Sequence, residues 1–287
     1  MSINSNLIKR TATGVIFVAA LVGCIVGGSI PFTLLFLLIT ALTIGEFGSI
    51  MEKTGEVQIN KRICMLAGMF LFLCFSYVGL QPGSGEVFIP YLFLMIYLLV
   101  SELYKKQKNP VNNWAYGMMS QVYIALPFSL LNVLAYHSIA ADGASVTASS
   151  YNYVLPLSIF IFTWVNDTGA YCTGMLFGKH RLFERISPKK SWEGSIGGAV
   201  FSMVAAAALA HYFTFMSLGE WCGLALVVVV FGTWGDLTES LLKRTLGIKD
   251  SGNILPGHGG MLDRFDSTLM AVPASVVYLY IMELIAA

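Results

Sequence analysis

Charged residues are scarce in this sequence: Asp, Glu, Lys and Arg together make up 11% of its 287 residues. Its five cysteines are odd in number, widely spaced and within apolar runs, so the sequence contains neither a disulfide framework nor a CxxC metal site. No internal repeat is visible, which leaves an inverted-repeat transporter without support. With a formal net charge of +1, nothing in the sequence implies a nucleic-acid partner.

Apolar residues are abundant instead. They make up 56% of the chain, against roughly 45–50% in ordinary soluble domains. A bilayer core about 30 Å thick takes up ~20 apolar residues per helical span, so we expect an all-α integral membrane protein. Nine candidate spans lie near residues 11–30, 32–51, 63–80, 87–104, 114–136, 153–177, 194–216, 221–242 and 267–286.

The placement of the basic residues supports nine spans. All 17 lie before the first run or between alternate pairs of runs: Lys9, Arg10; Lys53, Lys61, Arg62; Lys105, Lys106, Lys108; Lys179, Arg181, Arg185, Lys189, Lys190; Lys243, Arg244, Lys249, Arg264. Because Lys and Arg are retained on the cytoplasmic side, this pattern predicts a cytoplasmic N-terminus and an external C-terminus.

The residues that carry chemistry lie in the second half of the chain. We interpret residues 1–150 as scaffold helices, and 151–287 as a catalytic membrane region with cytoplasmic loops 178–194 and 243–266. In the scaffold, Glu46 and Glu102 are expected to reach the interface or to pair with nearby lysines. A polar group beside hydrocarbon is costly, so the dense charge of 236–266 indicates a working site.

Asn166 and Asp167 lie inside the sixth apolar run. At 1.5 Å per residue they are roughly 16 Å from its cytoplasmic end, where an ionisable group needs a partner. A metal or substrate contact in a water-filled cavity is favoured over a carboxylate hydrogen-bonded between helices.

Loop 178–194 is expected to turn at Ser187-Pro188 and to begin the next helix after Lys189, Lys190 and Ser191. Such a helix start can hold phosphate oxygens through backbone N–H groups and charge. Attraction to anionic lipid headgroups explains this loop equally well by itself.

Two helix ends meet at the stretch 236–266. Asp236, Ser240 and Lys243 share one helix face, and Arg244 follows. Three glycines in residues 257–260 let backbone approach a ligand, and two carboxylates spaced i and i+3, at 263 and 266, can point into one site. Carboxylates without cysteine suit Mg²⁺, and neighbouring cations suit a polyphosphate. Together they favour phosphoryl or nucleotidyl transfer over a merely salt-bridged loop.

The string SLLKRTLGIKDSGNILPGHGGMLDRFD at 240–266 resembles the signature of the phosphatidate cytidylyltransferase family without departure. Asn166-Asp167, SPKKSWEG at 187–194 and Gly235-Asp236 resemble the secondary motifs of that family. The resemblance therefore covers about residues 160–270.

The resemblance implies a homodimeric membrane enzyme, with residues 1–150 as the dimerising region, that condenses CTP with phosphatidic acid to give CDP-diacylglycerol and pyrophosphate. It implies Mg²⁺ and a monovalent cation such as K⁺, with metal ligands at Asp236 and Asp263, and we add Asp167 as a candidate ligand. The lack of a long hydrophilic N-terminal extension favours a bacterial plasma membrane.

The expected site residues fall into two groups. The candidate catalytic residues are Asp236, Asp263, Lys243 and Asp266. The candidate substrate contacts are Ser240, Arg244, Lys249, Asp250, His258, Gly259, Gly260, Arg264, Lys189, Lys190, Ser191 and Asn166. His258 either hydrogen-bonds a phosphate or fixes its loop.

Three other functions use some of the same residue types. A CTP-dependent kinase of polyprenol or another lipid alcohol would use similar groups but release CDP. An ion-coupled transporter would use Asp167 and Asp236 as intramembrane cation sites, yet its charges should appear near the midplane in both halves of the chain. A CDP-alcohol phosphotransferase needs a particular sequel to its Asp-Gly pair, and Asp142-Gly143 lacks it.

Overall fold

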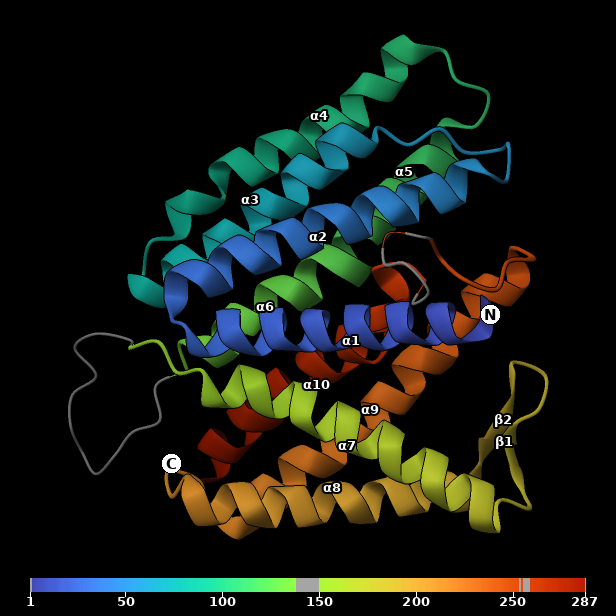
Figure 1. The fold of residues 1–287 in the computed structure, drawn as a ribbon. Helices are drawn as coiled ribbons and strands as arrows, with labels where there is room; N and C mark the ends of the chain where they lie inside the picture. Colours follow the sequence, from blue (N-terminus) through green and yellow to red (C-terminus); the bar gives the residue numbers. More distant parts are fainter. Residues whose placement is uncertain (1, 138–149, 253, 255–258, 287) are drawn as a thin grey trace. The chain divides into compact units, whose positions relative to one another are not determined.

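The computed structural model describes residues 2–137, 150–252, 254 and 259–286 (Figure 1). The chain forms two compact units. The first comprises Met1–Ser138, Thr147–Tyr153 and Ile248–Phe265, and the second comprises Ile139–Val146, Val154–Gly247 and Asp266–Ala287. The described residues of 248–265 thus pack with the N-terminal helices although they lie within the predicted catalytic region in sequence.

Helices make up nearly all regular structure of the first unit. They are α1 (Ser2–Val26), α2 (Ser29–Glu52), α3 (Lys61–Leu80), the 3-10 turn η1 (Gly85–Phe88), α4 (Ile89–Lys105), α5 (Pro110–Ser120), the π-helical turn η2 (Gln121–Ala125) and α6 (Leu126–Ala135). Pro127 lacks a backbone donor, which accounts for the π-helical turn just before it.

A cluster of phenylalanines forms the core of the first unit. Phe36 of α2 and Phe128 of α6 have ring centroids 6.2 Å apart. Phe265, from the signature string, packs edge-on against Phe128 at 5.3 Å and against Phe17 of α1 at 5.9 Å. Edge-to-face packing is a favoured aromatic arrangement, so the end of the signature is anchored in this core.

The second unit contains α7 (Val154–Phe177), α8 (Trp192–Tyr212), α9 (Leu218–Thr245) and, from Asp266 onward, α10 (Leu262–Ala286). Helices α7 and α8 run side by side (Figure 1). Gly169 and Gly198 permit this: a Cβ on Gly169 would lie 2.9 Å from Phe201, and a Cβ on Gly198 would strike Asn166. Small residues are typical of close helix packing in membranes.

Loop 178–194 differs from its prediction. Instead of a turn at Ser187-Pro188, it forms a two-stranded antiparallel hairpin, β1 (Arg181–Phe183) and β2 (Ser187–Ser191). The register pairs Arg181 with Ser191. Helix α8 does begin where expected, because the Ser191 side chain caps it by accepting a hydrogen bond from the Gly194 N–H at 3.1 Å.

The described helices confirm a multi-pass, predominantly helical membrane protein. Each of the nine predicted apolar runs coincides with a helix or a continuous helical stretch. Seven helical stretches in the described part of the chain are long and apolar enough to span a bilayer, and α1 contributes a shorter apolar segment, Thr11–Val26. Helix α7 carries Asn166 and Asp167 and is not among the seven. The count of nine spans and the orientation stay predictions.

Within each unit, a polar contact joins two segments that are far apart in the sequence. In the first unit, the Asn109 amide donates to the Glu56 carbonyl at 3.1 Å, joining the loops after α2 and α4. In the second unit, an ion pair of 2.5 Å between Lys190 and Asp236 joins the hairpin to α9.

Candidate functional site

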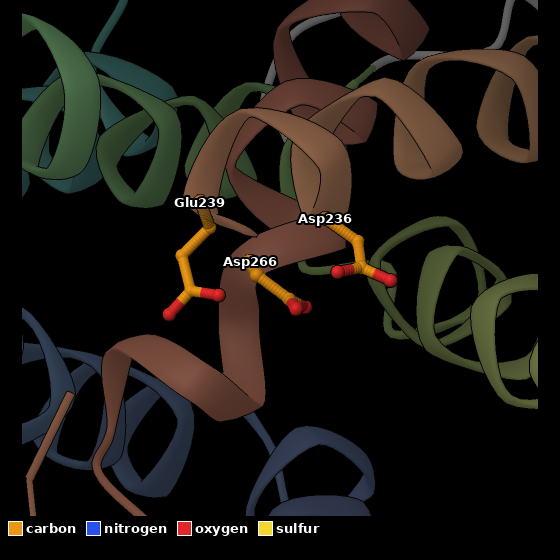
Figure 2. A group of neighbouring side chains, drawn as sticks. All are labelled: Asp236, Glu239 and Asp266. Carbon is orange, nitrogen blue, oxygen red and sulfur yellow. The ribbon is translucent and has the colours of Figure 1, made fainter. Parts of the chain in front are cut away.

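Three carboxylates of the second unit converge where α9 and α10 pack together. Oxygens of Asp236, Glu239 and Asp266 all lie within 4.8 Å of one another. Asp236 and Glu239 project from α9 and Asp266 from α10, with the Asp266 carboxylate between the other two (Figure 2). We call these three residues the acid cluster.

Close contact between α9 and α10 creates this cluster. A Cβ on Gly235 would lie 2.5 Å from the Asp266 carbonyl oxygen and 3.1 Å from the Cα of Ser267. Only glycine therefore lets α10 approach α9 at this height. The glycine directly before Asp236 has a packing role that brings the carboxylates of two helices together.

Cations offset the negative charge of the acid cluster. Lys190 pairs with Asp236 at 2.5 Å, and Lys243 forms an ion pair with Glu239 one turn earlier on α9. The hydroxyl of Ser240 donates to Asp236 at 3.2 Å, as their spacing predicted.

A cavity of about 210 Å³ opens between α7, β2 and the start of α8. Its lining includes five predicted site residues: Asn166, Asp167, Lys189, Lys190 and Ser191. The side-chain amide oxygen of Asn166 (Oδ1) is buried and makes no hydrogen bond within the described part of the chain. Since Lys190 also pairs with Asp236, the cavity and the acid cluster are directly linked. Ammonium groups beside a helix start suit phosphate oxygens.

The first unit holds the other part of the signature. One Asp263 oxygen accepts hydrogen bonds from the Ser251 N–H and hydroxyl, both at 2.9 Å, and from the Gly260 N–H at 2.8 Å. Gly259 has φ +80°, a conformation that favours glycine, and a Cβ there would lie 2.5 Å from Asp263. The Asp263 carboxylate thereby fixes the loop that precedes α10.

The predicted residues thus divide between the two units. The acid cluster of the second unit contains Asp236 and Asp266, and Ser240 and Lys243 contact it. The cavity of that unit is lined by Asn166, Asp167, Lys189, Lys190 and Ser191. In the first unit, Asp263 at the start of α10 meets Gly259 and Gly260 of the preceding loop. We call the described residues of 248–261 the signature loop. Arg244, Lys249, Asp250 and Arg264 are exposed, and His258 lies outside the described residues.

Two glutamates were not predicted as site residues. Glu239 is fully buried in the acid cluster, and its spacing of three from Asp236 and four from Lys243 is a helical signal that could have revealed it. Glu46 was expected at the interface or beside a lysine, and that prediction is wrong: it is buried and binds Ser251, Met261 and Leu262. Glu102 does pair with Lys105, at 2.9 Å, as expected.

The donor chemistry of the acid cluster fits a magnesium ion. It offers carboxylate oxygens alone, which Mg²⁺ prefers over the softer ligands of zinc or copper. Asp167 lies outside this cluster and lines the neighbouring cavity. Carboxylates gathered this closely repel one another, so a divalent cation there would relieve that repulsion.

The fold and these clusters define a polytopic helical membrane enzyme whose candidate site combines carboxylates with lysines. The chain belongs to the cytidylyltransferase family, whose model matches residues 8–282. This match covers nearly the whole chain. It includes the N-terminal helices, which the signature motifs do not cover.

Relatives from several bacteria match over most of their length. A phosphatidate cytidylyltransferase of Staphylococcus haemolyticus is 34% identical over 219 residues, covering 74% of this chain and 78% of the relative. One from Haemophilus influenzae is 35% identical over 218 residues, covering 72% and 75%. One from Staphylococcus aureus is 34% identical over 208 residues, covering 72% and 74%.

Proposed function

We propose that this enzyme transfers the cytidylyl group of CTP to phosphatidic acid, forming CDP-diacylglycerol and pyrophosphate for phospholipid synthesis. Membership of the cytidylyltransferase family and the names of its relatives support this reaction. The observation that carries it is the Lys190–Asp236 ion pair, which links a lysine-lined cavity to the acid cluster. That arrangement places groups for binding phosphate beside groups for binding a metal.

The reaction needs one bond exchange. An oxygen of the phosphatidic acid phosphate attacks the α-phosphorus of CTP in line, and the bond from that phosphorus to the bridging oxygen of pyrophosphate breaks. The attacking phosphate is already ionised near neutral pH, so neither a general base nor a covalent enzyme intermediate is required. Catalysis then consists of positioning and charge balance.

The described side chains supply those two functions. Lys189 and Lys190 hold phosphate oxygens in the cavity, and Ser191 keeps the first turn of α8 in place by capping it. Asn166 and Asp167 line the same cavity from α7. Each of these groups is held on a helix or on β2, so the cavity is organised before substrate arrives.

Asp236, Glu239 and Asp266 are the residues that would hold Mg²⁺. When bound, Mg²⁺ supplies positive charge that stabilises the reacting phosphates. Asp263 as a metal ligand and K⁺ as a second cation rest on the family resemblance. We also propose a homodimer in a bacterial plasma membrane, which the bacterial relatives favour.

The test is pyrophosphate release by the detergent-purified protein given CTP, phosphatidic acid and Mg²⁺, with each component omitted in turn. The proposal expects release that needs all three, with CDP-diacylglycerol formed in equal amount. CDP released on addition of a lipid alcohol would establish the lipid kinase instead. A folded sample that turns over no nucleotide would overturn the proposal and return attention to transport.

A further inference from the structure

Glu46 lies on α2, about 200 residues before the signature loop, yet its side chain accepts hydrogen bonds from that loop and from the start of α10. Its side chain accepts hydrogen bonds from the Met261 N–H at 2.9 Å and the Leu262 N–H at 3.1 Å, and from the Ser251 hydroxyl. Glu46 itself is 8% exposed. Glu46, a residue of the N-terminal helices, therefore hydrogen-bonds the segment that carries the family signature.

The partners explain why a carboxylate stands here. The first N–H groups of a helix have no partner within the helix, and Met261 and Leu262 stand at the start of α10. Negative charge is also favoured at this end of a helix dipole. A buried carboxylate is costly unless several donors satisfy it. Glu46 and the start of α10 consequently stabilise one another.

Two signature glycines make room for Glu46. A Cβ on Gly252 would lie 2.6 Å from one Glu46 oxygen, and a Cβ on Gly260 would collide with the other. Gly260 was predicted as a substrate contact, but these contacts give it a packing reason as well. The loop is shaped around the Glu46 carboxylate.

Ser251 connects Glu46 to Asp263. Its hydroxyl lies within hydrogen-bonding distance of a carboxylate oxygen of each residue. The same Asp263 oxygen also accepts from the N–H groups of Ser251 and Gly260. Glu46 thus fixes one side of the loop, and the loop in turn fixes the rotamer of Asp263.

We propose that Glu46 is a positioning residue for the reaction: it holds the signature loop against α2 so that Asp263 keeps a single orientation. The importance of that orientation for turnover rests on the proposed function. The holding of the loop rests on the contacts alone. The N-terminal helices are therefore more than a scaffold, because one of their side chains orders the signature.

Amide hydrogen exchange of the substrate-free, detergent-purified protein tests the holding of the loop. In Glu46→Gln, one of the two carboxylate oxygens is replaced by an NH₂ donor. The side chain should then accept from only one of the two backbone N–H groups. Exchange at Met261 and Leu262 should then rise about tenfold or more, as expected when local opening becomes easier. Glu102→Gln is the matched control, since Glu102 is also buried in the first unit but binds Lys105 and Asn113.

Kinetics of the same variants test the link to turnover. Glu46→Gln should lower kcat about tenfold or more while KM for CTP changes less than about threefold, because a small misplacement near the reaction is costly. Ser251→Ala, which leaves both backbone bonds to Glu46 intact, should have an intermediate effect. The control should retain wild-type kcat.

Unchanged exchange at Met261 and Leu262 in Glu46→Gln, or equal loosening in Glu102→Gln, would overturn the proposal. Loosened exchange with an unchanged kcat per folded enzyme would reduce Glu46 to a structural role and overturn its link to turnover. Because the exchange experiment uses no substrate, it decides the role of Glu46 in the loop even if the wild-type protein failed to turn over CTP.

Discussion

Replacing Lys243 with Met would remove the cation that pairs with Glu239 in the acid cluster. Glu239 is 0% exposed and the Lys243 side chain only 16%, so water compensates little for the loss. Two unit charges 4.8 Å apart repel by about 3.5 kcal/mol at an effective dielectric constant of ~20. Breaking a buried ion pair typically costs ~3–5 kcal/mol. We expect the free energy of unfolding to fall by about 3 kcal/mol.

A double-mutant cycle isolates this effect. Unfolding by SDS in mixed micelles without divalent cations would be measured for the wild type, Lys243→Met, Glu239→Gln and the double variant. Adding Glu239→Gln to Lys243→Met should raise the free energy of unfolding again by about 2 kcal/mol, because the neutral amide leaves less buried charge to compensate. The reasoning would be refuted if the changes in unfolding free energy of the two single variants added up to that of the double variant within about 0.5 kcal/mol.

Magnesium provides a second arm of the same experiment. If the acid cluster holds Mg²⁺ as proposed, a Mg²⁺ concentration of about 100 times the wild-type Kd should stabilise the wild type by ~2.7 kcal/mol. All four proteins are compared at that same concentration. The gain should be larger in Lys243→Met, where the carboxylates keep more uncompensated charge, and smaller in Glu239→Gln. Equal Mg²⁺ stabilisation of all four proteins would place the ion elsewhere.

Three further substitutions test other contacts. Asp263→Asn should lower the rate of pyrophosphate release by about 10²-fold or more with the protein still folded, because a charged group that stabilises the reaction is lost. A near-normal rate would contradict the role of Asp263 as a metal ligand. Gly260→Ala should cost about 1–3 kcal/mol of unfolding free energy, because its Cβ would collide with Glu46, and an unchanged SDS unfolding midpoint would count against that packing. Lys190→Met should lower kcat/KM for CTP more than Lys189→Met, since Lys190 also contacts the acid cluster; the opposite order in a steady-state assay would reverse their roles.

Helix positions followed from sequence because hydropathy is a local property. Every apolar run predicted a helix at the correct place, from 11–30 in α1 to 267–286 in α10. The hairpin at 181–191 was missed because its strands are only three and five residues long, and their pairing was not visible in composition. A short polar loop offers too few alternating apolar positions to reveal a strand.

Motif chemistry predicted many of the residues that gather in the second unit. Lysines and Ser191 before a helix, Asn166-Asp167 within one, and aspartates at the ends of two others all belong to the cavity or the acid cluster. Residue type and helical spacing sufficed to predict which side chains gather there, because residues three or four apart share one face of a helix. Glu239 carried the same spacing signal and was overlooked.

The sequence by itself determined the membrane class, the helical elements and the family, since each depends on local hydropathy or on a contiguous motif. Only the tertiary structure decided which carboxylates became neighbours. Glu46 reaches Leu262 across 216 positions, and Asp266 meets Glu239 because Gly235 lets two helices touch. Such contacts depend on how helices pack, and no period or spacing in the sequence encodes the distance between side chains so far apart in the chain.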